Sequence, residues 1–295
     1  MKKIILFLLL VLFVFTWWQK SHKREIHPSE DKPIIVTSGY VGYALAKQIG
    51  GDKIKVSMLM QPNAEPHAFE PTPGSLVTVH HADLFFYISF ELEPWVRDVI
   101  ANAIGSTRTI GLADFLEKTP DPHVWLDFDN VLIMARKIAQ QIADVDRNNQ
   151  SFYIKNFAAF EQEIAELKEA YNEGLSSCQS REVVHAGHMA FGLLAEKYNL
   201  KMTSLSGSSH EGEHSVKHMV DLIKHMKSKR VRVVFTEEAV SPRLAQTVAE
   251  ETGAQILPLF TVEHISKEDY DNNATYGELM RRNLESLQWG LVCPA

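Results

Sequence analysis

The chain has 295 residues, of which 45% are hydrophobic and 23% are charged, a composition typical of a globular protein with room for two domains. The net charge of −7 argues against nucleic acid as a partner, because binding to phosphates needs a basic surface. The 13 histidines are a more positive indication, since neutral imidazole binds zinc, copper, iron and nickel.

Residues 1–24 have the pattern of a secretory signal. Lys2 and Lys3 precede an apolar run, Ile4–Trp18, that is followed by polar and basic residues. The run is shorter than the ~20 residues of a spanning helix, and it lacks a clear small-residue cleavage site. We therefore expect a cleaved signal or an uncleaved anchor. The segment holds no cysteine, so a lipoprotein is not expected, and the mature chain should be periplasmic or otherwise extracytoplasmic.

The first half of the chain alternates predicted strands and helices. Strands are expected at residues 33–37, 53–60 and 83–88, and helices at 40–49 and 75–80. Apolar strands separated by helices indicate a parallel sheet that is covered on both faces. The sequence therefore predicts an N-terminal α/β lobe over residues 32–145.

The middle of the chain predicts one long helix. Neither proline nor glycine occurs from His123 to Glu173, and a polar stretch at 144–150 breaks or caps an earlier helical pattern. Six apolar residues then recur at spacings of four and three, namely Tyr153, Phe157, Phe160, Ile164, Leu167 and Tyr171. Such a stripe is typical of a helix with one buried face. We expect a connecting helix over residues 146–177.

The second half repeats the pattern of the first. Strands are expected at residues 181–184, 201–205, 231–236 and 255–260, and helices at 188–198, 215–227, 242–252 and 276–287. The prediction is a second α/β lobe over residues 178–295, which gives two Rossmann-like lobes with mainly parallel sheets joined by a long helix. In an exported protein, Cys178 and Cys293 are expected to form a disulfide.

Three histidines occupy equivalent positions beyond predicted strands. His67 and His123 lie in loops that prolines stiffen, and His188 follows the strand at 181–184. Ligands of such sheets bind beyond the carboxyl ends of the strands, so all three can face one cleft between the lobes. His185 competes with His188 for the third place. Zinc takes about four ligands, so three imidazoles would leave one position open.

The remaining histidines are expected to be less directly involved. His80 and His81 lie at a predicted helix-to-strand junction, and His218 and His225 recur at helical spacing, so all four are expected at the surface. His210 and His214 lie in a loop of small residues. They are either solvated or form a secondary site for metal capture.

At these motifs the chain resembles the periplasmic solute-binding proteins of zinc and manganese ABC importers, a family that includes metal-binding lipoproteins and adhesins. The resemblance covers about Lys32 to Leu291. The segments that carry it are Pro66–Pro71, Ala82–Leu84, Asp121–Asp127, His188–Gly192 and Phe235–Glu237. It implies two α/β lobes bridged by a rigid helix, with a metal between the lobes on His67, His123 and His188. It also implies a binding protein that delivers the metal to a membrane permease. We expect a monomer that is not an enzyme.

Two departures from the family pattern concern the metal. The family often supplies an aspartate from a Leu-Asp-Pro segment, and the corresponding stretch here, 257–261, has Phe260 in its place. The fourth position is therefore open to water, Glu65, Glu263 or His264. Three imidazoles without that aspartate favour zinc over manganese. The short segment at 114–121 lacks the His-rich loop of many zinc-specific members, which keeps manganese as the alternative.

Three other functions compete with metal transport. A zinc-dependent hydrolase would use Glu65 or Glu263 as its base, although the sequence has no H-E-x-x-H helix. Binding of haem or a metal chelate would need an aromatic pocket, and Phe69, Trp95 and Trp125 are better explained as core residues. An extracellular adhesin is compatible with metal binding.

Overall fold

The computed structural model describes residues 32–102, 105–205, 216–237 and 243–294. Pro33 to Ala295 form one compact unit. The expected signal at 1–24 and the loop with His210 and His214 lie outside the described residues. Within the described ranges, the helices lack the combination of length and apolar character that is needed to cross a bilayer.

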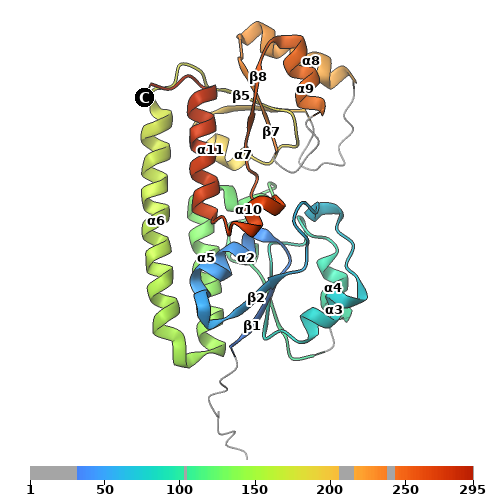
Figure 1. The fold of residues 1–295 in the computed structure, drawn as a ribbon, viewed down its shortest axis with the longest axis vertical. Coiled ribbons are helices and arrows are strands. Elements are labelled where there is room, and N and C mark those ends of the chain that lie inside the picture. Colours follow the sequence, from blue (N-terminus) through green and yellow to red (C-terminus); the bar gives the residue numbers. More distant parts are fainter. Residues whose placement is uncertain (1–31, 103–104, 206–215, 238–242, 295) are drawn as a thin grey trace, which may run out of the picture. The chain divides into compact units, whose positions relative to one another are not determined.

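The first sheet consists of four parallel strands in the order β2-β1-β3-β4. Their bounds are β1 (Ile34–Thr37), β2 (Lys55–Met58), β3 (Leu84–Tyr87) and β4 (Arg108–Gly111). All four residues of β3 are buried, as expected for a central strand of a sheet that is covered on both faces. The covering helices are α2 (Tyr40–Gly50), α3 (Pro73–His80) and α4 (Val96–Asn102) (Figure 1). Strand β4 was absent from the sequence prediction because Arg-Thr-Ile-Gly has no apolar run.

The second sheet repeats this topology in the order β6-β5-β7-β8, again with parallel strands only. Its strands are β5 (Glu182–His185), β6 (Lys201–Ser204), β7 (Val233–Thr236) and β8 (Gln255–Pro258). The helices that follow them are α7 (Gly192–Lys197), α8 (Val216–Lys229) and α9 (Arg243–Thr252). The predicted pair of parallel α/β lobes is confirmed.

The helix expected to begin at His188 begins only at Gly192. The backbone N–H of His188 donates to the Glu237 carboxylate instead of entering a helix. His188 therefore lies in the loop that follows β5, where its side chain is held by a residue from another strand end.

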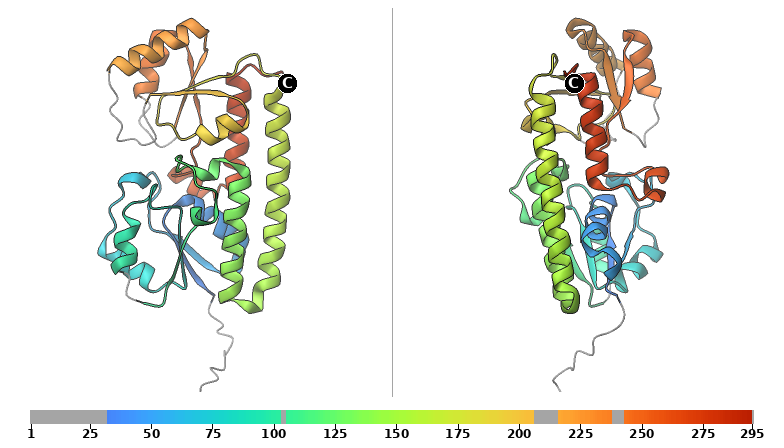
Figure 2. Two further views of the ribbon diagram at one scale, coloured as in Figure 1. Left: turned by 180° about the vertical axis from the view of Figure 1, so that it is seen from behind. Right: turned by 60° about the vertical axis from the view of Figure 1, so that its left-hand side comes forward.

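Three long helices support both lobes. They are α5 (Phe128–Val145), α6 (Gln150–Ser176) and α11 (Tyr276–Gly290). Figure 2 shows α6 running beside α5 and α11, and α6 also packs against α2 of the first lobe. The predicted stripe is buried, with Phe157 at its edge, and the Tyr171 hydroxyl donates to the Met280 carbonyl at 2.7 Å. The expected long helix is confirmed, with a short turn at Arg147–Asn149 before it.

Cys178 and Cys293 form a disulfide, as the sequence predicted. The bridge joins the residue just beyond α6 to the segment that follows α11, across a sequence separation of 115 residues. A crosslink over a long loop stabilises a fold mainly by restricting the unfolded chain. The disulfide also links the C-terminal ends of α6 and α11.

Candidate metal centre

His67 lies in the loop beyond β2, within a single 3-10 turn at Pro66–Ala68. Its backbone N–H donates to Glu65 Oε1 at 3.1 Å, so Glu65 caps the turn. The indole N–H of Trp95 donates to the Pro66 carbonyl at 2.9 Å. These two bonds and the fixed φ of Pro66 restrict the loop, which positions the His67 ring.

His123 lies in the loop between β4 and α5 and is held by Asp121. Asp121 Oδ1 accepts the His123 backbone N–H at 3.0 Å and lies 2.8 Å from its ring Nδ1. The next anchor is Trp125, whose indole N–H donates to the Thr261 carbonyl at 2.7 Å. Because a carboxylate occupies Nδ1, the other ring nitrogen, Nε2, is directed toward the cleft as a possible ligand.

His188 is held in the same way by Glu237, which directly follows β7. Glu237 Oε1 accepts the His188 backbone N–H at 3.1 Å and lies 2.8 Å from its Nδ1. The close approach requires glycine at position 187, since a Cβ there would lie 2.0 Å from Glu237 Oε1. The side chains of His188 and Glu237 are completely buried.

The three predicted histidines converge. The Nε2 atoms of His123 and His188 are 3.0 Å apart, and the ring of His67 lies 5.8 Å and 6.1 Å, centroid to centroid, from theirs. His67 Nε2 is buried and has no hydrogen-bond partner among the described residues. The structure therefore directs one ring nitrogen of each histidine into a common space.

Glu263 completes a group of four. Its Oε2 lies 3.3 Å from His123 Nε2 and its Oε1 lies 3.4 Å from His188 Nε2. One ligand atom from each of His67, His123, His188 and Glu263 falls within 4.8 Å of the others. Ligand atoms of a tetrahedral zinc site with bonds of about 2.1 Å lie about 3.4 Å apart, so these separations suit a zinc ion.

The other two candidates for the fourth position form a different group. Glu65 and His264 cluster with Glu263, again within 4.8 Å, but without the three histidines. The carboxylate of Glu263 is therefore common to both groups.

Phe260, which replaces the aspartate of the family pattern, lies outside these groups. Its backbone N–H donates to Asn283 Oδ1 at 2.6 Å, and Arg282 lies over its ring. The chain reaches the histidines three residues later, after Val262 at φ 64°. A positive φ is strained for a β-branched residue, and it turns the backbone just before Glu263.

His185, the rival of His188, is buried beside the site but is not in the cluster. Its Nδ1 lies 3.1 Å from the His188 carbonyl, and its ring packs edge-on against Phe191. His185 therefore contacts the backbone of the loop that carries His188.

The carboxylates that hold His123 and His188, Asp121 and Glu237, were not identified from the sequence. Two signals were present. Asp121 lies two residues before a candidate ligand and can cap its turn. Glu237 lies just beyond the carboxyl end of β7, where ligand sites of parallel sheets form.

Charges in the site depend strongly on these contacts. Burial alone would lower the pKa of His188, but Glu263 and Glu237 outweigh it and raise that pKa to about 10. The pKa of His123 is also raised, by Asp121 and Glu263 against the effect of burial. Burial dominates at His67 and lowers its pKa. For Glu263, burial is outweighed by the adjacent His188 and His123, which hold its pKa well below the usual range.

Two small cavities among the described residues border the cluster. Two cavities of about 10 Å³ each border Glu263, one with His264 and one with Glu93 and Trp125 in its wall. A volume of this size holds about one water molecule. Trp95 and Trp125 are buried core residues, as expected, and Phe69 packs edge-on against Trp95. These cavities are far too small for haem.

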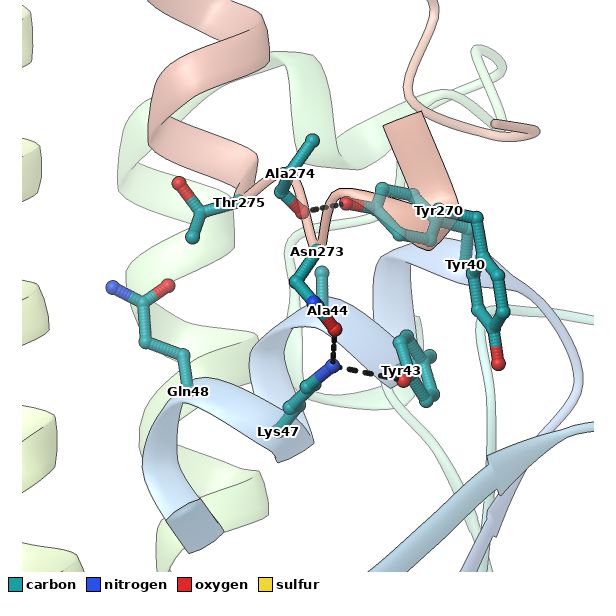
Figure 3. A pocket seen from close by; sticks show the side chains of 9 residues that line it. All are labelled: Tyr40, Tyr43, Ala44, Lys47, Gln48, Tyr270, Asn273, Ala274 and Thr275. Carbon is teal, nitrogen blue, oxygen red and sulfur yellow. Dashed lines mark hydrogen bonds between the residues drawn. The ribbon is translucent and has the colours of Figure 1, made fainter. Parts of the chain in front are cut away.

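A larger cavity of 150 Å³ lies between α2 and the segment before α11 (Figure 3). Its polar groups already contact one another. Lys47 Nζ donates to Asn273 Oδ1 at 2.5 Å and to the Tyr43 hydroxyl at 3.2 Å, and the Tyr40 hydroxyl donates to the Ala274 carbonyl. None of its lining residues is a histidine, cysteine or carboxylate, so this cavity is not the metal centre.

The relatives of this chain include both sequences and structures. The zinc uptake protein ZnuA of Bacillus subtilis is 30% identical over 302 residues, covering 95% of this chain and 94% of ZnuA. The zinc-binding lipoprotein AdcA of Streptococcus pneumoniae is 28% identical, and the match covers 98% of this chain but 61% of AdcA. This chain thus corresponds to about three fifths of that relative.

Two solved structures resemble it over 88% of its length and 99% of theirs. The laminin binding protein Lmb of Streptococcus agalactiae, described as having adhesin and metal transporting activity, gives a TM-score of 0.81 at 32% identity. The Zn(II)-bound ZnuA-like domain of pneumococcal AdcA gives 0.78 at 29% identity. A family model described as zinc-uptake complex component A, periplasmic, matches residues 35–290. The chain therefore belongs to the ZnuA family of zinc-uptake components.

Proposed function

We propose that this chain binds one zinc ion outside the cytoplasm on His67, His123, His188 and Glu263, and delivers it to the membrane permease of an ABC importer. Zinc is then the transported substrate and not a resident cofactor. The observation that carries the proposal is the convergence of His123 Nε2 and His188 Nε2 at 3.0 Å, each on a ring whose Nδ1 faces a carboxylate.

The tautomers implied by those contacts support metal binding. When Nδ1–H donates to a carboxylate, the neutral ring presents a lone pair at Nε2. Two such lone pairs 3.0 Å apart repel unless a cation or a proton lies between them. Glu263 adds a buried negative charge to the same space, so a divalent cation compensates both effects.

The donor set favours zinc over manganese. Three imidazole nitrogens and one carboxylate match the nitrogen-rich tetrahedral sites of zinc, whereas manganese prefers oxygen ligands. The named relatives ZnuA and AdcA are zinc proteins by description, which agrees with this choice. Since the family belongs to uptake systems, transport explains the site without a hydrolytic reaction.

Delivery to a permease is the role that membership of the family supports. A site built from loops of both lobes can release its ion when the lobes or the loops shift. The lobes at 32–145 and 178–295, with the connector at 146–177, stay the proposed division of the chain. A monomer and the lack of a lipid anchor also stay predictions, and two relatives are described as lipoproteins.

Competitive titration tests the metal assignment. Metal-free protein is titrated with zinc and with manganese against a chromophoric chelator, and the bound metal is counted by mass spectrometry. We expect one tightly bound zinc ion per chain and weaker manganese binding. His81→Gln, which changes the exposed histidine that directly follows α3, serves as the matched control and should bind zinc like the wild type. Tighter binding of manganese than of zinc would contradict the assignment.

A further inference from the structure

We propose that Glu65, Glu263 and His264 form a second, outer position for a divalent transition-metal ion, next to the inner position on the three histidines. The proposal rests on the proposed function, because the two positions share the Glu263 carboxylate. In this arrangement Oε2 of Glu263 faces the inner ion, and Oε1 is within reach of the outer one.

The distances around Glu263 fit such a bridge. Oε2 lies 3.3 Å from His123 Nε2, whereas Oε1 lies between the two groups, 3.4 Å from His188 Nε2 and 3.5 Å from Nδ1 of His264. All three values are close to the separation of about 3.4 Å between ligands of one tetrahedral zinc ion. Carboxylates that bridge two metal ions hold them about 3.5–4 Å apart. One carboxylate therefore contributes a ligand atom on each side.

Glu263 is suited to this role because histidines are the only groups that approach its oxygens among the described ion pairs. Its side chain is completely buried, and neither oxygen has a hydrogen-bond partner among the described residues. Buried carboxylates are almost always hydrogen-bonded or bound to metal. A single inner ion needs only one of the two oxygens.

The two loops that carry the outer group are joined by a backbone contact. The Asn63 N–H donates to the Ile265 carbonyl at 3.0 Å, which joins the loop of Glu65 to the loop of His264. Asn63 itself adopts φ 65°, and the Glu65 side chain is fixed by its bond to the His67 backbone N–H. The two loops are therefore held together beside the outer group.

Space and charge also favour an ion at this position. A cavity of about 10 Å³ is lined by Tyr40, Met60, Glu263, His264 and neighbouring residues, which is room for about one water molecule or ion. Four carboxylates surround the histidines, namely Asp121, Glu237, Glu263 and Glu65. With neutral imidazoles, one zinc ion leaves two of these four negative charges uncompensated, and a second ion balances them.

The two groups differ in the number of protein ligands, four in the inner group and three in the outer one. Each has one partly exposed member on the first lobe, His67 or Glu65, whereas the His264 side chain is 7% exposed and those of His123, His188 and Glu263 are completely buried. Fewer protein ligands make the outer position weaker. Rotation of the Glu263 carboxylate moves an ion bound there toward the inner histidines. The outer position is therefore the place where an entering metal ion binds first.

Zinc titration of the full chain tests the proposal, with calorimetry for weak binding and a chelator for tight binding. We expect two zinc ions per wild-type chain in two separate events. His264→Gln should weaken the second event by about tenfold or more while changing the first less than about threefold. Glu65→Gln, whose amide oxygen can still accept the His67 N–H, should also weaken the second event by about tenfold or more. His81→Gln is the control for a histidine outside both groups and should reproduce both events.

His123→Ala separates this proposal from the proposed function, since His123 belongs to the inner group alone. We expect it to abolish the tight event and retain the weak one. A wild-type chain that binds a single zinc ion overturns the outer position but not the inner one. A second event that persists unchanged in both His264→Gln and Glu65→Gln also overturns it, whereas a missing tight event in the wild type refutes the proposed function.

Discussion

Two buried glutamates border the same small cavity and differ in charge. Glu93 and Glu263 are both almost completely buried and line a space of about 10 Å³. Burial raises the pKa of Glu93 to about 7, although the Ser38 hydroxyl and backbone N–H groups offset part of the effect. The same burial is outweighed at Glu263 by His188 and His123, and its pKa falls well below the usual range.

The difference shows that histidines, and not burial, decide the charge of a carboxylate in this cleft. Glu93 accepts the Ile88 N–H at 2.7 Å and has no imidazole near it in the described contacts. Glu263 faces His123 and His188 within 3.4 Å. In the metal-free protein, protons on these imidazoles compensate Glu263. Zinc takes over that role when it binds, so protons and metal compete for one set of groups.

Removal of an imidazole should give the largest effect. We expect His188→Ala to lower zinc affinity by more than about 100-fold, since even loss of a partner of a ligand costs 10–100-fold. It should also destabilise the metal-free protein by about 3 kcal/mol, because Glu263 loses a compensating charge. Chelator competition and chemical denaturation measure the two effects. An unchanged zinc affinity would exclude His188 as a ligand, and His185→Gln is the control for loss of a neighbouring buried imidazole.

Substitution of Glu93 should stabilise the metal-free protein, whereas loss of His188 destabilises it. Glu93 has a folded pKa of about 7 against 4.5, so the folded state binds more protons than the unfolded state between these pH values. Stability is therefore lost as pH rises from 4.5 to 7. Glu93→Gln removes this loss and should stabilise the protein by up to about 3 kcal/mol at pH 8. Near pH 4, where the wild-type side chain is neutral in both states, the difference should disappear.

Denaturant unfolding at pH 4 and pH 8 measures this effect. Equal stability changes at the two pH values would show that Glu93 is not protonated in the folded protein near neutral pH. The neutral amide also tests whether zinc affinity depends on Glu93, and we expect it to change little because Glu93 is outside the ligand group.

The carboxylates behind the imidazoles should have the next largest effect. Asp121→Asn and Glu237→Gln keep the shape of the side chains but remove the charges that fix the Nδ1–H tautomers. We expect zinc affinity to fall by about 10–100-fold in each variant. Competition against a chelator gives the affinities, with Asp129→Asn as the control for a carboxylate that contacts Lys168 and Lys197. A fall confined to one variant would show that the two histidines are not held equivalently.

The parts of this molecule that follow from local pattern could be predicted from the sequence. The stripe of α6 and the buried strand β3 carry their periodicity in the residues themselves. His67 and His123 were located because prolines mark stiff loops. The predicted start of a helix at His188 was wrong because Glu237, 49 residues away, captures its N–H.

The sequence named Glu263 as one of several candidates for the fourth ligand position but gave no reason to prefer it over Glu65 or His264. Alignment of the family pattern points to Phe260, which faces Asn283 and Arg282 instead. The position of the proposed ligand Glu263 depends on the turn at Val262, whose positive φ is unusual for valine and has no local signal. The two overlapping groups around Glu263 likewise arise from loops that meet only in the folded chain.

The change of zinc affinity per pH unit should be the smallest of these effects. It is also the most direct test of competition between protons and metal. His188 has a pKa of about 10 in the metal-free protein against an ordinary 6.5. Below pH 10 zinc must displace its proton, so affinity should rise about tenfold per pH unit between about 6.5 and 10.

The same shift stabilises the metal-free fold below pH 6.5, and that contribution is lost as pH rises through about 10. Metal-free stability and zinc affinity should therefore change in opposite directions with pH. Glu237→Gln removes one cause of the raised pKa, so the rise in affinity should level off at a lower pH than in the wild type. Calorimetry in buffers of different ionisation enthalpy counts the released protons. An affinity that is constant from pH 6.5 to 9, with no proton released, would mean that His188 is already neutral before zinc arrives.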